Sequence, residues 1–82
     1  RVLDVYAGSR NNGANVQQYS WNGSNAQKWI LRKNINGTYT FINAGSGKAL
    51  DIHLGYEKNG ANVQQYDDNG SNAQKFVLKK VD

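Results

Sequence analysis

The sequence predicts an all-β chain built from two copies of one repeat, the second of them truncated. A segment of 17 residues, Asn12–Lys28, recurs as Asn59–Lys75 with 15 identical positions at a constant offset of 47 residues. Short bursts of β-branched and aromatic residues alternate with Asn-Gly and Gly-Ser pairs, without the 3.6-residue apolar period of a helix. Bursts of this kind, separated by turn residues, are typical of short β-strands.

Five of these bursts mark the expected strands in chain order. Each is short and rich in β-branched or aromatic residues, which favour extended backbone. The expected strands are Val2–Tyr6, Val16–Tyr19, Trp29–Leu31, Tyr39–Ile42 and Ala49–Ile52.

Alternation along these strands predicts which side chains are buried, because neighbouring side chains point to opposite faces of a sheet. The residues expected to face inward are Leu3, Val5, Leu50 and Ile52, and those expected to face outward are Asp4, Tyr6, Asp51 and His53. The same parity places Gln17 and Tyr19 opposite Val16. One outer face is therefore predicted to carry Asp, Gln and Tyr side chains.

A glutamine and an aromatic residue share a parity near the end of each repeated segment. A large aromatic followed by leucine at this spacing favours the core, so Trp29 and Phe76 are assigned to the interior. Gln27 and Gln74 then lie beside buried backbone. There a side-chain amide can bridge a carbonyl and an N–H that a turn leaves unpaired. The first role expected of these glutamines is structural.

The repeat also indicates what the second copy lacks. Repeat one is assigned to residues 1–47 and repeat two to residues 48–82, which end before any counterpart of Gly37–Gly47. The strand equivalent to Tyr39–Ile42 is therefore missing, and a single chain is expected to leave an open core and unpaired strand edges. Two arrangements would close it: a homo-oligomer, or a missing third repeat of the same protein, this chain then being a fragment.

Composition disfavours several classes of function. The chain has no cysteine and one histidine, so neither a disulfide nor a metal site is expected, and no cofactor is implied. The net charge of +4 comes partly from the repeat-related pairs Arg32-Lys33 and Lys79-Lys80, which are typical of solvated strand ends and disfavour a nucleic-acid partner. No apolar run approaches the ~20 residues of a membrane helix, so membrane insertion is not expected.

Two Gln-Xaa-aromatic triplets, Gln27–Trp29 and Gln74–Phe76, each follow a Leu-Asp-Val/Ile strand and an Asn-Gly-Ala-Asn-Val-Gln-Gln-Tyr stretch. In this arrangement the chain resembles the ricin-type β-trefoil lectins, or QxW-repeat family, over essentially its whole length. The resemblance implies three such units about a pseudo-threefold axis, so the chain would be a partial β-trefoil of about two repeats. It also implies a non-catalytic, secreted bacterial module, extracellular or associated with the cell wall, that is attached to an enzyme or assembly.

The resemblance further implies a shallow sugar pocket on each repeat. By position its residues are Asp4, Gln17, Tyr19 and Gln27 in repeat one, and Asp51, Gln64, Tyr66 and Gln74 in repeat two. Their chemistry suits a pyranose, because carboxylates and amides hydrogen-bond hydroxyls while an aromatic ring stacks on an apolar C–H face. A galactose-like sugar, whose axial hydroxyl leaves one face apolar, is the first expectation, and glycans that contain galactose are the expected partners.

Two departures from the family pattern affect this prediction. Many sugar-binding members carry Asn immediately before the Gln of the triplet, where this chain has Ala26 and Ala73. Asn25 and Asn72, one residue earlier, are the candidates to replace that amide. The second departure, Phe76 in place of Trp, should still fill the core.

The two copies differ where specificity would be set. Repeat one reads Tyr19-Ser20-Trp21 where repeat two reads Tyr66-Asp67-Asp68, and Tyr6 is exchanged for His53. If the strand direction persists, Trp21 adds a second stacking surface and Asp68 adds an acceptor. The two sites are therefore predicted to be non-equivalent, with Trp21 and His53 among the candidate sugar contacts.

Two other classes of function remain as alternatives. An enzyme is disfavoured because Asp67 and Asp68 are adjacent and so point apart, whereas a glycosidase needs two acids that face each other across a bond; no catalytic residue is assigned. The other alternative is a structural or protein-interaction module that has lost sugar binding. In that case the strand aspartates would anchor turns through backbone N–H groups, and the tyrosines would be buried.

Overall fold

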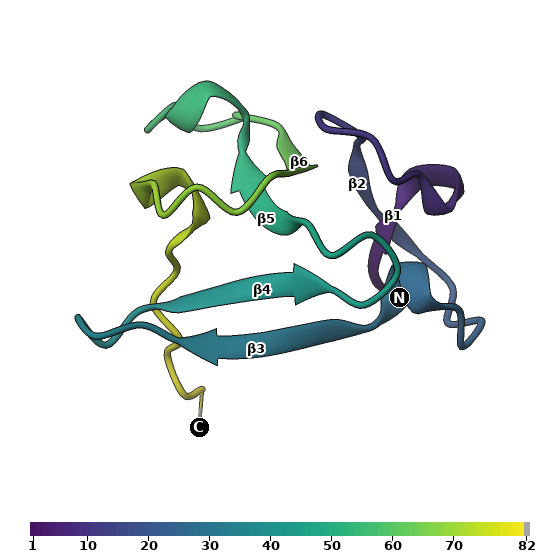
Figure 1. The fold of residues 1–82 in the computed structure, drawn as a ribbon, viewed down its shortest axis with the longest axis horizontal. Coiled ribbons are helices and arrows are strands. Elements are labelled where there is room, and N and C mark those ends of the chain that lie inside the picture. Colours follow the sequence, from purple (N-terminus) through teal and green to yellow (C-terminus); the bar gives the residue numbers. More distant parts are fainter. Residues whose placement is uncertain (82) are drawn as a thin grey trace.

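The computed structural model describes residues 1–81. These residues form six short antiparallel strands and four 3₁₀ turns, joined by loops (Figure 1). Residue 82, the last position assigned to repeat two, lies outside them. The strands are β1 (Val2–Val5), β2 (Val16–Tyr19), β3 (Trp29–Lys33), β4 (Tyr39–Asn43), β5 (Ala49–Ile52) and β6 (Val63–Tyr66). The 3₁₀ turns are η1 (Tyr6–Gly8), η2 (Asn25–Gln27), η3 (His53–Gly55) and η4 (Asn72–Gln74).

The strands form two antiparallel sheets whose order follows the chain. β1 pairs with β2, and β3, β4, β5 and β6 form a four-stranded sheet in sequence order. The five predicted strands are confirmed, although β1 ends at Val5 because the chain turns at Tyr6, and β3 continues to Lys33. β5 and β6 repeat β1 and β2, with the same register of Asp opposite Gln: Asp4 pairs with Gln17 and Asp51 with Gln64.

After η4, the second repeat pairs with β4 of the first at an isolated bridge between Tyr39 and Phe76. Tyr39 N donates to Phe76 O at 2.8 Å, and Phe76 N donates to Tyr39 O at 2.9 Å. The rings of Phe41 and Phe76 meet edge to face with centroids 5.8 Å apart. Beyond this bridge, residues 77–81 form no strand, whereas their counterparts in repeat one, residues 30–34, lie in β3 or directly after it.

The apolar core is small and lies where the two repeats meet. Val5, Val16 and Leu50 are its buried residues, and partly buried aromatics pack against them. Trp29 and Phe76 are among these aromatics, so both contact the core as predicted, but neither is fully covered.

Parity was a poor guide to burial at two kinds of position. Leu3 was expected inside but is exposed, whereas its counterpart Leu50 is buried. Asp4 and Asp51 were expected on the surface but are buried, with only 5–6 % of each exposed. Parity correctly places the aspartates on the face opposite Val5 and Leu50. The amide side chains of Gln27 and Gln74, however, cover the aspartates on that face.

An exposed apolar edge follows from the missing strands. Figure 1 places β3 and the C-terminal end on the same side of the molecule. The large apolar side chains exposed on these segments are Ile30, Leu31, Val77, Leu78 and Val81. Exposed apolar side chains gathered in this way are typical of a surface that another protein surface contacts.

Buried polar side chains fill much of the interior. The largest fully buried side chains include Gln65, Gln74, Asn43 and Thr40 beside Val5. Within residues 1–81 every buried side-chain nitrogen and oxygen has a hydrogen-bond partner. Because an unpaired buried polar group costs about 1–3 kcal/mol, complete pairing is a condition of this fold.

Gln65 fastens repeat two to repeat one. Its Nε2 donates to Ser9 O and Asn11 O, both at 2.9 Å, and its Oε1 accepts from Ser46 Oγ at 2.7 Å. Its backbone N–H donates to Ala14 O at 3.0 Å. The equivalent residue of repeat one, Gln18, is exposed.

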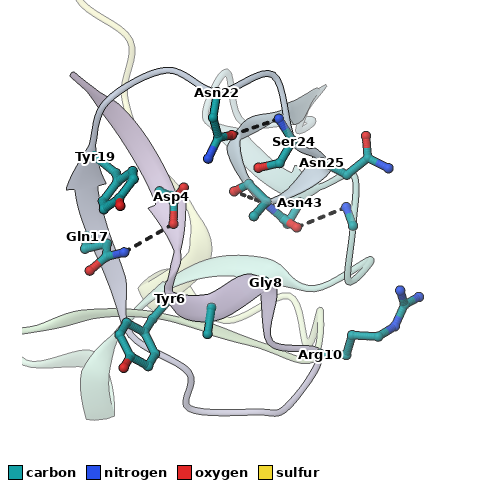
Figure 2. A pocket seen from close by; sticks show the side chains of 13 residues that line it. Asp4, Tyr6, Gly8, Arg10, Gln17, Tyr19, Asn22, Ser24, Asn25 and Asn43 are labelled. Atoms are coloured by element: carbon teal, nitrogen blue, oxygen red, sulfur yellow. Dashed lines mark hydrogen bonds between the residues drawn. The ribbon is translucent and has the colours of Figure 1, made fainter.

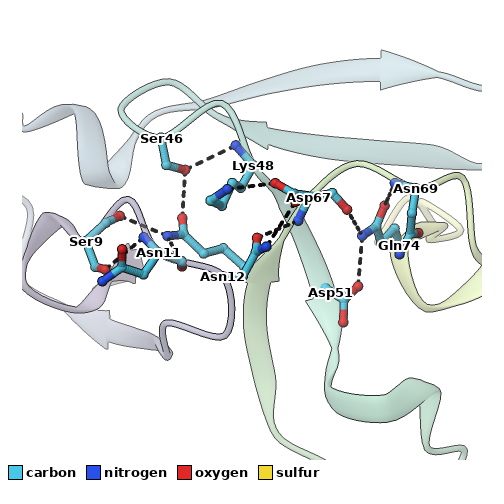
Figure 3. Close-up of polar contacts among 10 residues, drawn as sticks. Ser9, Asn11, Asn12, Ser46, Lys48, Asp51, Asp67, Asn69 and Gln74 are labelled. Carbon is cyan, nitrogen blue, oxygen red and sulfur yellow. Dashed lines mark hydrogen bonds and ion pairs between the residues drawn. The ribbon is translucent and has the colours of Figure 1, made fainter.

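Two aspartates that are specific to repeat two strengthen the same junction. Asp67 accepts from Asn12 Nδ2 of repeat one at 2.9 Å, and within repeat two from Lys48 Nζ at 2.7 Å (Figure 3). These two groups hold the pKa of Asp67 below its ordinary value. Asp68 forms a two-pronged ion pair with Arg32 of β3, and this pairing lowers the pKa of Asp68.

No helix in residues 1–81 has the length and apolar character needed to cross a bilayer.

Replacing Gln65 by Leu should lower the free energy of unfolding by about 2–4 kcal/mol, because several buried partners lose their hydrogen bonds at once. The matched control is Gln18→Leu, the same change at the equivalent exposed position, which should cost less than about 0.5 kcal/mol. Urea unfolding followed by tryptophan fluorescence measures both. Equal costs for the two variants would contradict the role assigned to Gln65.

Acid should weaken the junction through Asp67. Because the folded-state pKa lies below the ordinary value of 3.8, the carboxylate stabilises the fold above that value, and this contribution is lost as the pH falls through the lowered pKa. Between neutral pH and pH values below 3.8, the urea midpoint of the wild type should therefore fall further than that of Asp67→Asn. Parallel pH profiles would show that Asp67 does not stabilise the fold.

Candidate functional site

Each repeat presents a carboxylate held by two side-chain amides. In repeat one the register sets Asp4 of β1 directly opposite Gln17 of β2, and Gln17 Nε2 donates to Asp4 Oδ1 at 3.3 Å. Gln27 Nε2 donates to the other oxygen, Oδ2, at 2.7 Å. A carboxylate has about four lone-pair positions, so two remain for a ligand.

Gln27 performs the bridging role that its parity predicted. Besides holding Asp4, its Nε2 donates to Ser20 O at 2.9 Å, and its Oε1 accepts from Asn22 N at 2.7 Å. The amide thereby joins β1, the end of β2 and the loop that leads into η2. All of its hydrogen-bonding groups are used within the protein, and it lies behind the aspartate with 5 % of its surface exposed.

Repeat two builds the same arrangement at equivalent positions. Asp51 accepts from Gln64 Nε2 at 3.2 Å and from Gln74 Nε2 at 2.9 Å. Gln74 also donates to Asp67 O at 2.8 Å and accepts from Asn69 N at 3.0 Å.

A cleft of about 630 Å³, the first pocket, opens above Asp4 (Figure 2). This volume falls within the roughly 300–1,000 Å³ of small-molecule sites. Figure 2 shows Tyr19 and Gln17 on one side of the pocket and Asn25 and Arg10 on the other. The residues that line it are Asp4, Tyr6, Ala7, Gly8, Arg10, Gln17, Tyr19, Asn22, Ser24, Asn25, Ala26, Asn43 and Gly45.

A cleft of about 530 Å³, the second pocket, occupies the equivalent place on repeat two. Its residues are Asp51, Leu54, Gly55, Glu57, Gln64, Tyr66, Asn69, Ser71, Asn72 and Ala73. Every one of them lies 47 positions after a residue that lines the first pocket. The first pocket has three further lining residues, Tyr6, Asn43 and Gly45.

The turn between β4 and β5 supplies part of the additional wall of the first pocket. Asn43 is buried and donates through Nδ2 to Ala26 O at 3.0 Å, while its Oδ1 accepts from Gly45 N at 3.0 Å. A Cβ at Gly45 would lie only 3.4 Å from Asn25 Cβ, so the turn packs closely against η2.

The tyrosines have the accessibility that stacking requires. Tyr19 is 50 % exposed and Tyr66 is 41 % exposed, and each lines its pocket beside the carboxylate. The hydrogen bonds of both aspartate carboxylates come from side-chain amides. This is the opposite of the arrangement expected for a module without a pocket, in which the tyrosines are buried and backbone groups occupy the carboxylates.

Five of the predicted pocket residues do not line either pocket: Trp21, Gln27, His53, Asp68 and Gln74. Trp21 is 61 % exposed but does not line the first pocket, and Asp68 is paired with Arg32 and does not line the second. The strand parity that suggested them stops applying where β2 and β6 end, at Tyr19 and Tyr66.

His53 also lies outside the second pocket, although it was a candidate contact. Its Nδ1 is 3.2 Å from Oε1 of Gln64, and its ring meets Tyr56 edge to face. His53 therefore reaches the site only through Gln64. Its counterpart Tyr6 does line the first pocket.

The remaining predicted residues fall into two groups. Asn25 and Asn72 line the pockets beside Ala26 and Ala73, so an amide is present near the position where family members carry Asn. Gln27 and Gln74 support the aspartates from behind and do not line the pockets. The structure adds residues that the sequence did not single out, since strand patterns give no position for loop residues: Asn22, Ser24, Asn69, Ser71, Asn43, Arg10 and Glu57.

No group of three or more His, Asp or Glu side chains within residues 1–81 could hold a metal ion. Asp67 and Asp68 take part in the junction between repeats.

A sequence profile for the ricin-type β-trefoil lectin domain-like family matches residues 1–66 and residues 25–82. No protein with a curated description matches the chain. Solved structures that share its fold include the following three. The designed threefold-symmetric protein ThreeFoil superposes with a TM-score of 0.87 and 42 % identity, over 89 % of this chain and 52 % of ThreeFoil.

The other two structures belong to larger proteins. The exo-β-1,3-galactanase 1,3Gal43A from Clostridium thermocellum matches with a TM-score of 0.93 and 34 % identity, over 96 % of this chain and 17 % of the galactanase. A mosquitocidal holotoxin matches with a TM-score of 0.86 and 31 % identity, over 98 % of this chain and 10 % of the toxin. The chain thus spans about half of ThreeFoil and smaller shares of the other two.

Proposed function

The chain belongs to the ricin-type β-trefoil lectin domain-like family, and from this membership and the geometry of its pockets we propose that it is a non-catalytic carbohydrate-binding module. One observation carries the proposal. Each repeat sets a carboxylate, oriented by two amides, beside an exposed tyrosine in an open cleft.

The positions of the side chains in the first pocket give each of them a role toward the sugar. Asp4 accepts hydrogen bonds from two neighbouring hydroxyls, Gln17 and Asn25 supply amide groups, and the ring of Tyr19 covers the apolar face of the sugar. Asp51, Gln64, Asn72 and Tyr66 do the same in the second pocket. A galactose-like sugar fits this set, because its axial hydroxyl leaves one ring face apolar.

Two linked pockets favour a targeting role. Weak single sites on one rigid body raise the effective concentration at a polysaccharide surface, so together they bind more tightly than either alone. The proposed module would hold an attached enzyme or assembly against a glycan outside the cell or at the cell wall. The 1,3Gal43A galactanase and the mosquitocidal toxin, both much longer than this chain, contain a region of the same fold.

The principal alternative is a structural or protein-interaction module that has kept the fold without sugar binding. Ala26 and Ala73 favour it, because an amide of the family pattern is absent at these positions. The exposure of Tyr19 and Tyr66 and the open lone pairs of the aspartates favour binding. An enzyme fits less well, since the adjacent acids Asp67 and Asp68 take part in the junction.

Tyr19→Ala should weaken galactose binding at the first pocket by about tenfold, because the stacking surface is lost. Chemical-shift titration of the isotope-labelled chain measures each pocket separately, so the unchanged second pocket is an internal reference. Trp21→Ala is the matched control, as this exposed aromatic does not line the pocket. Equal effects of the two variants, or none from Tyr19→Ala, would remove the proposed stacking role.

We further propose that a second copy of the chain, or a third repeat of the same protein, covers the exposed apolar edge formed by β3 and residues 77–81. Light scattering of the 82-residue chain should therefore give a mass above that of a monomer, 9.1 kDa. Leu31→Lys, which charges that edge, should return the mass to the monomer value. A well-folded monomeric wild type would exclude self-association as the route.

A further inference from the structure

The two pockets share a framework and differ in charge at the rim. Of the ten equivalent positions, eight carry the same residue in both repeats. Only two pairs differ: Ala7 with Leu54, and Arg10 with Glu57. The second of these reverses the charge at one rim position.

The loops that carry the two residues have the same backbone structure. Tyr6 N donates to Asn15 O, and His53 N donates to Asn62 O, each at 2.9 Å. The residues after them turn alike, because Ala7 and Leu54 both adopt left-handed φ values, of 55° and 53°.

The next hydrogen bonds of these loops also correspond. Ser9 N donates to Tyr6 O at 3.1 Å, and Tyr56 N donates to His53 O at 3.3 Å. Arg10 and Glu57 therefore occupy matching places on matching loops, so the difference between them is chemical and not one of loop shape.

Neither charge is neutralised by an ion pair within residues 1–81. The ion pairs there join Arg32 to Asp68 and Lys48 to Asp67. Lys58, the neighbour of Glu57, places its Nζ 4.5 Å above the ring of Tyr56. Both rim groups are exposed and available to a ligand.

The pocket charges therefore differ by two units. In the first pocket the charge of Arg10 offsets that of Asp4, whereas in the second pocket Glu57 adds to the negative charge of Asp51. Figure 2 shows Arg10 across the pocket from Tyr19 and Gln17. A sugar ring placed on Asp4 and Tyr19 would direct its far edge toward the guanidinium.

Building on the proposed sugar-binding function, we propose that Arg10 makes the first pocket selective for saccharides with an anionic substituent, and that Glu57 makes the second pocket reject them. A guanidinium donates two parallel N–H groups to a carboxylate or a sulfate, which gives charge-assisted hydrogen bonds. A carboxylate at the same place repels these anions. The two repeats thus share one binding framework, but the first attracts an anionic substituent on the sugar and the second repels it.

The test is a chemical-shift titration of the isotope-labelled chain with galactose, galacturonate and a sulfated galactose. Galacturonate should bind the first pocket about fivefold more tightly than galactose and the second pocket more weakly than galactose, with the preference fading as salt increases. The sulfated sugar shows whether the pocket reads carboxylate geometry or negative charge alone: equal preference assigns charge, and preference for galacturonate alone assigns the carboxylate.

The double variant Arg10→Glu/Glu57→Arg keeps the net charge and should exchange the preferences of the two pockets. Lys33→Glu is the control for overall charge, because it makes the same charge change as Arg10→Glu on β3, away from both pockets, and should leave the preference intact. If galactose binds both pockets and galacturonate shows no difference between them, charge selectivity is wrong while sugar binding stands. If no sugar binds either pocket, the proposed function fails and this inference fails with it.

Discussion

The site and the fold of each repeat depend on one buried amide, that of Gln27 or Gln74. In repeat one this amide holds the carboxylate of Asp4 while it pairs a carbonyl and an N–H of the loop that follows β2. Asp4 is buried, and a buried polar group left without a partner costs about 1–3 kcal/mol. The amide that makes the loop stable is therefore also the one that aims the carboxylate into the pocket. Folding and preparation of the site are thus one event, and a ligand meets an aspartate whose orientation is already fixed.

Buried, hydrogen-bonded polar side chains also explain how so small an apolar core suffices to define the structure. Val5, Val16 and Leu50 are the buried members of the core cluster, while Gln65 and Gln74 are among the largest fully buried side chains. Hydrophobic burial is not directional, but an amide requires its partners at defined distances and angles. The network therefore specifies which segments meet.

Sequence patterns predicted those features that depend on local order. Strand positions followed from the apolar bursts, and the role of Gln27 followed from parity beside a buried aromatic. Parity failed for Asp4 because it gives the direction of a side chain and not what covers it. It failed for Trp21 and Asp68 because alternation ends with the strand. The junction between repeats was out of reach, since no local pattern indicates that identical residues of two copies take up different environments.

The junction matters for function because it sets the distance and angle between two pockets that are alike in framework and different at the rim. Avidity requires that both pockets reach their sugars at once, and a loose connection between repeats would spread their separation over many values. Asp67 and Asp68 stand where repeat one has Ser20 and Trp21, and they fasten repeat two to Asn12 and Arg32 of repeat one. Divergence between the copies has therefore acted at two places with two results. At the rim it reverses a charge, which in the proposed function separates the ligands of the two pockets, and at the junction it adds contacts that fix the pockets relative to each other.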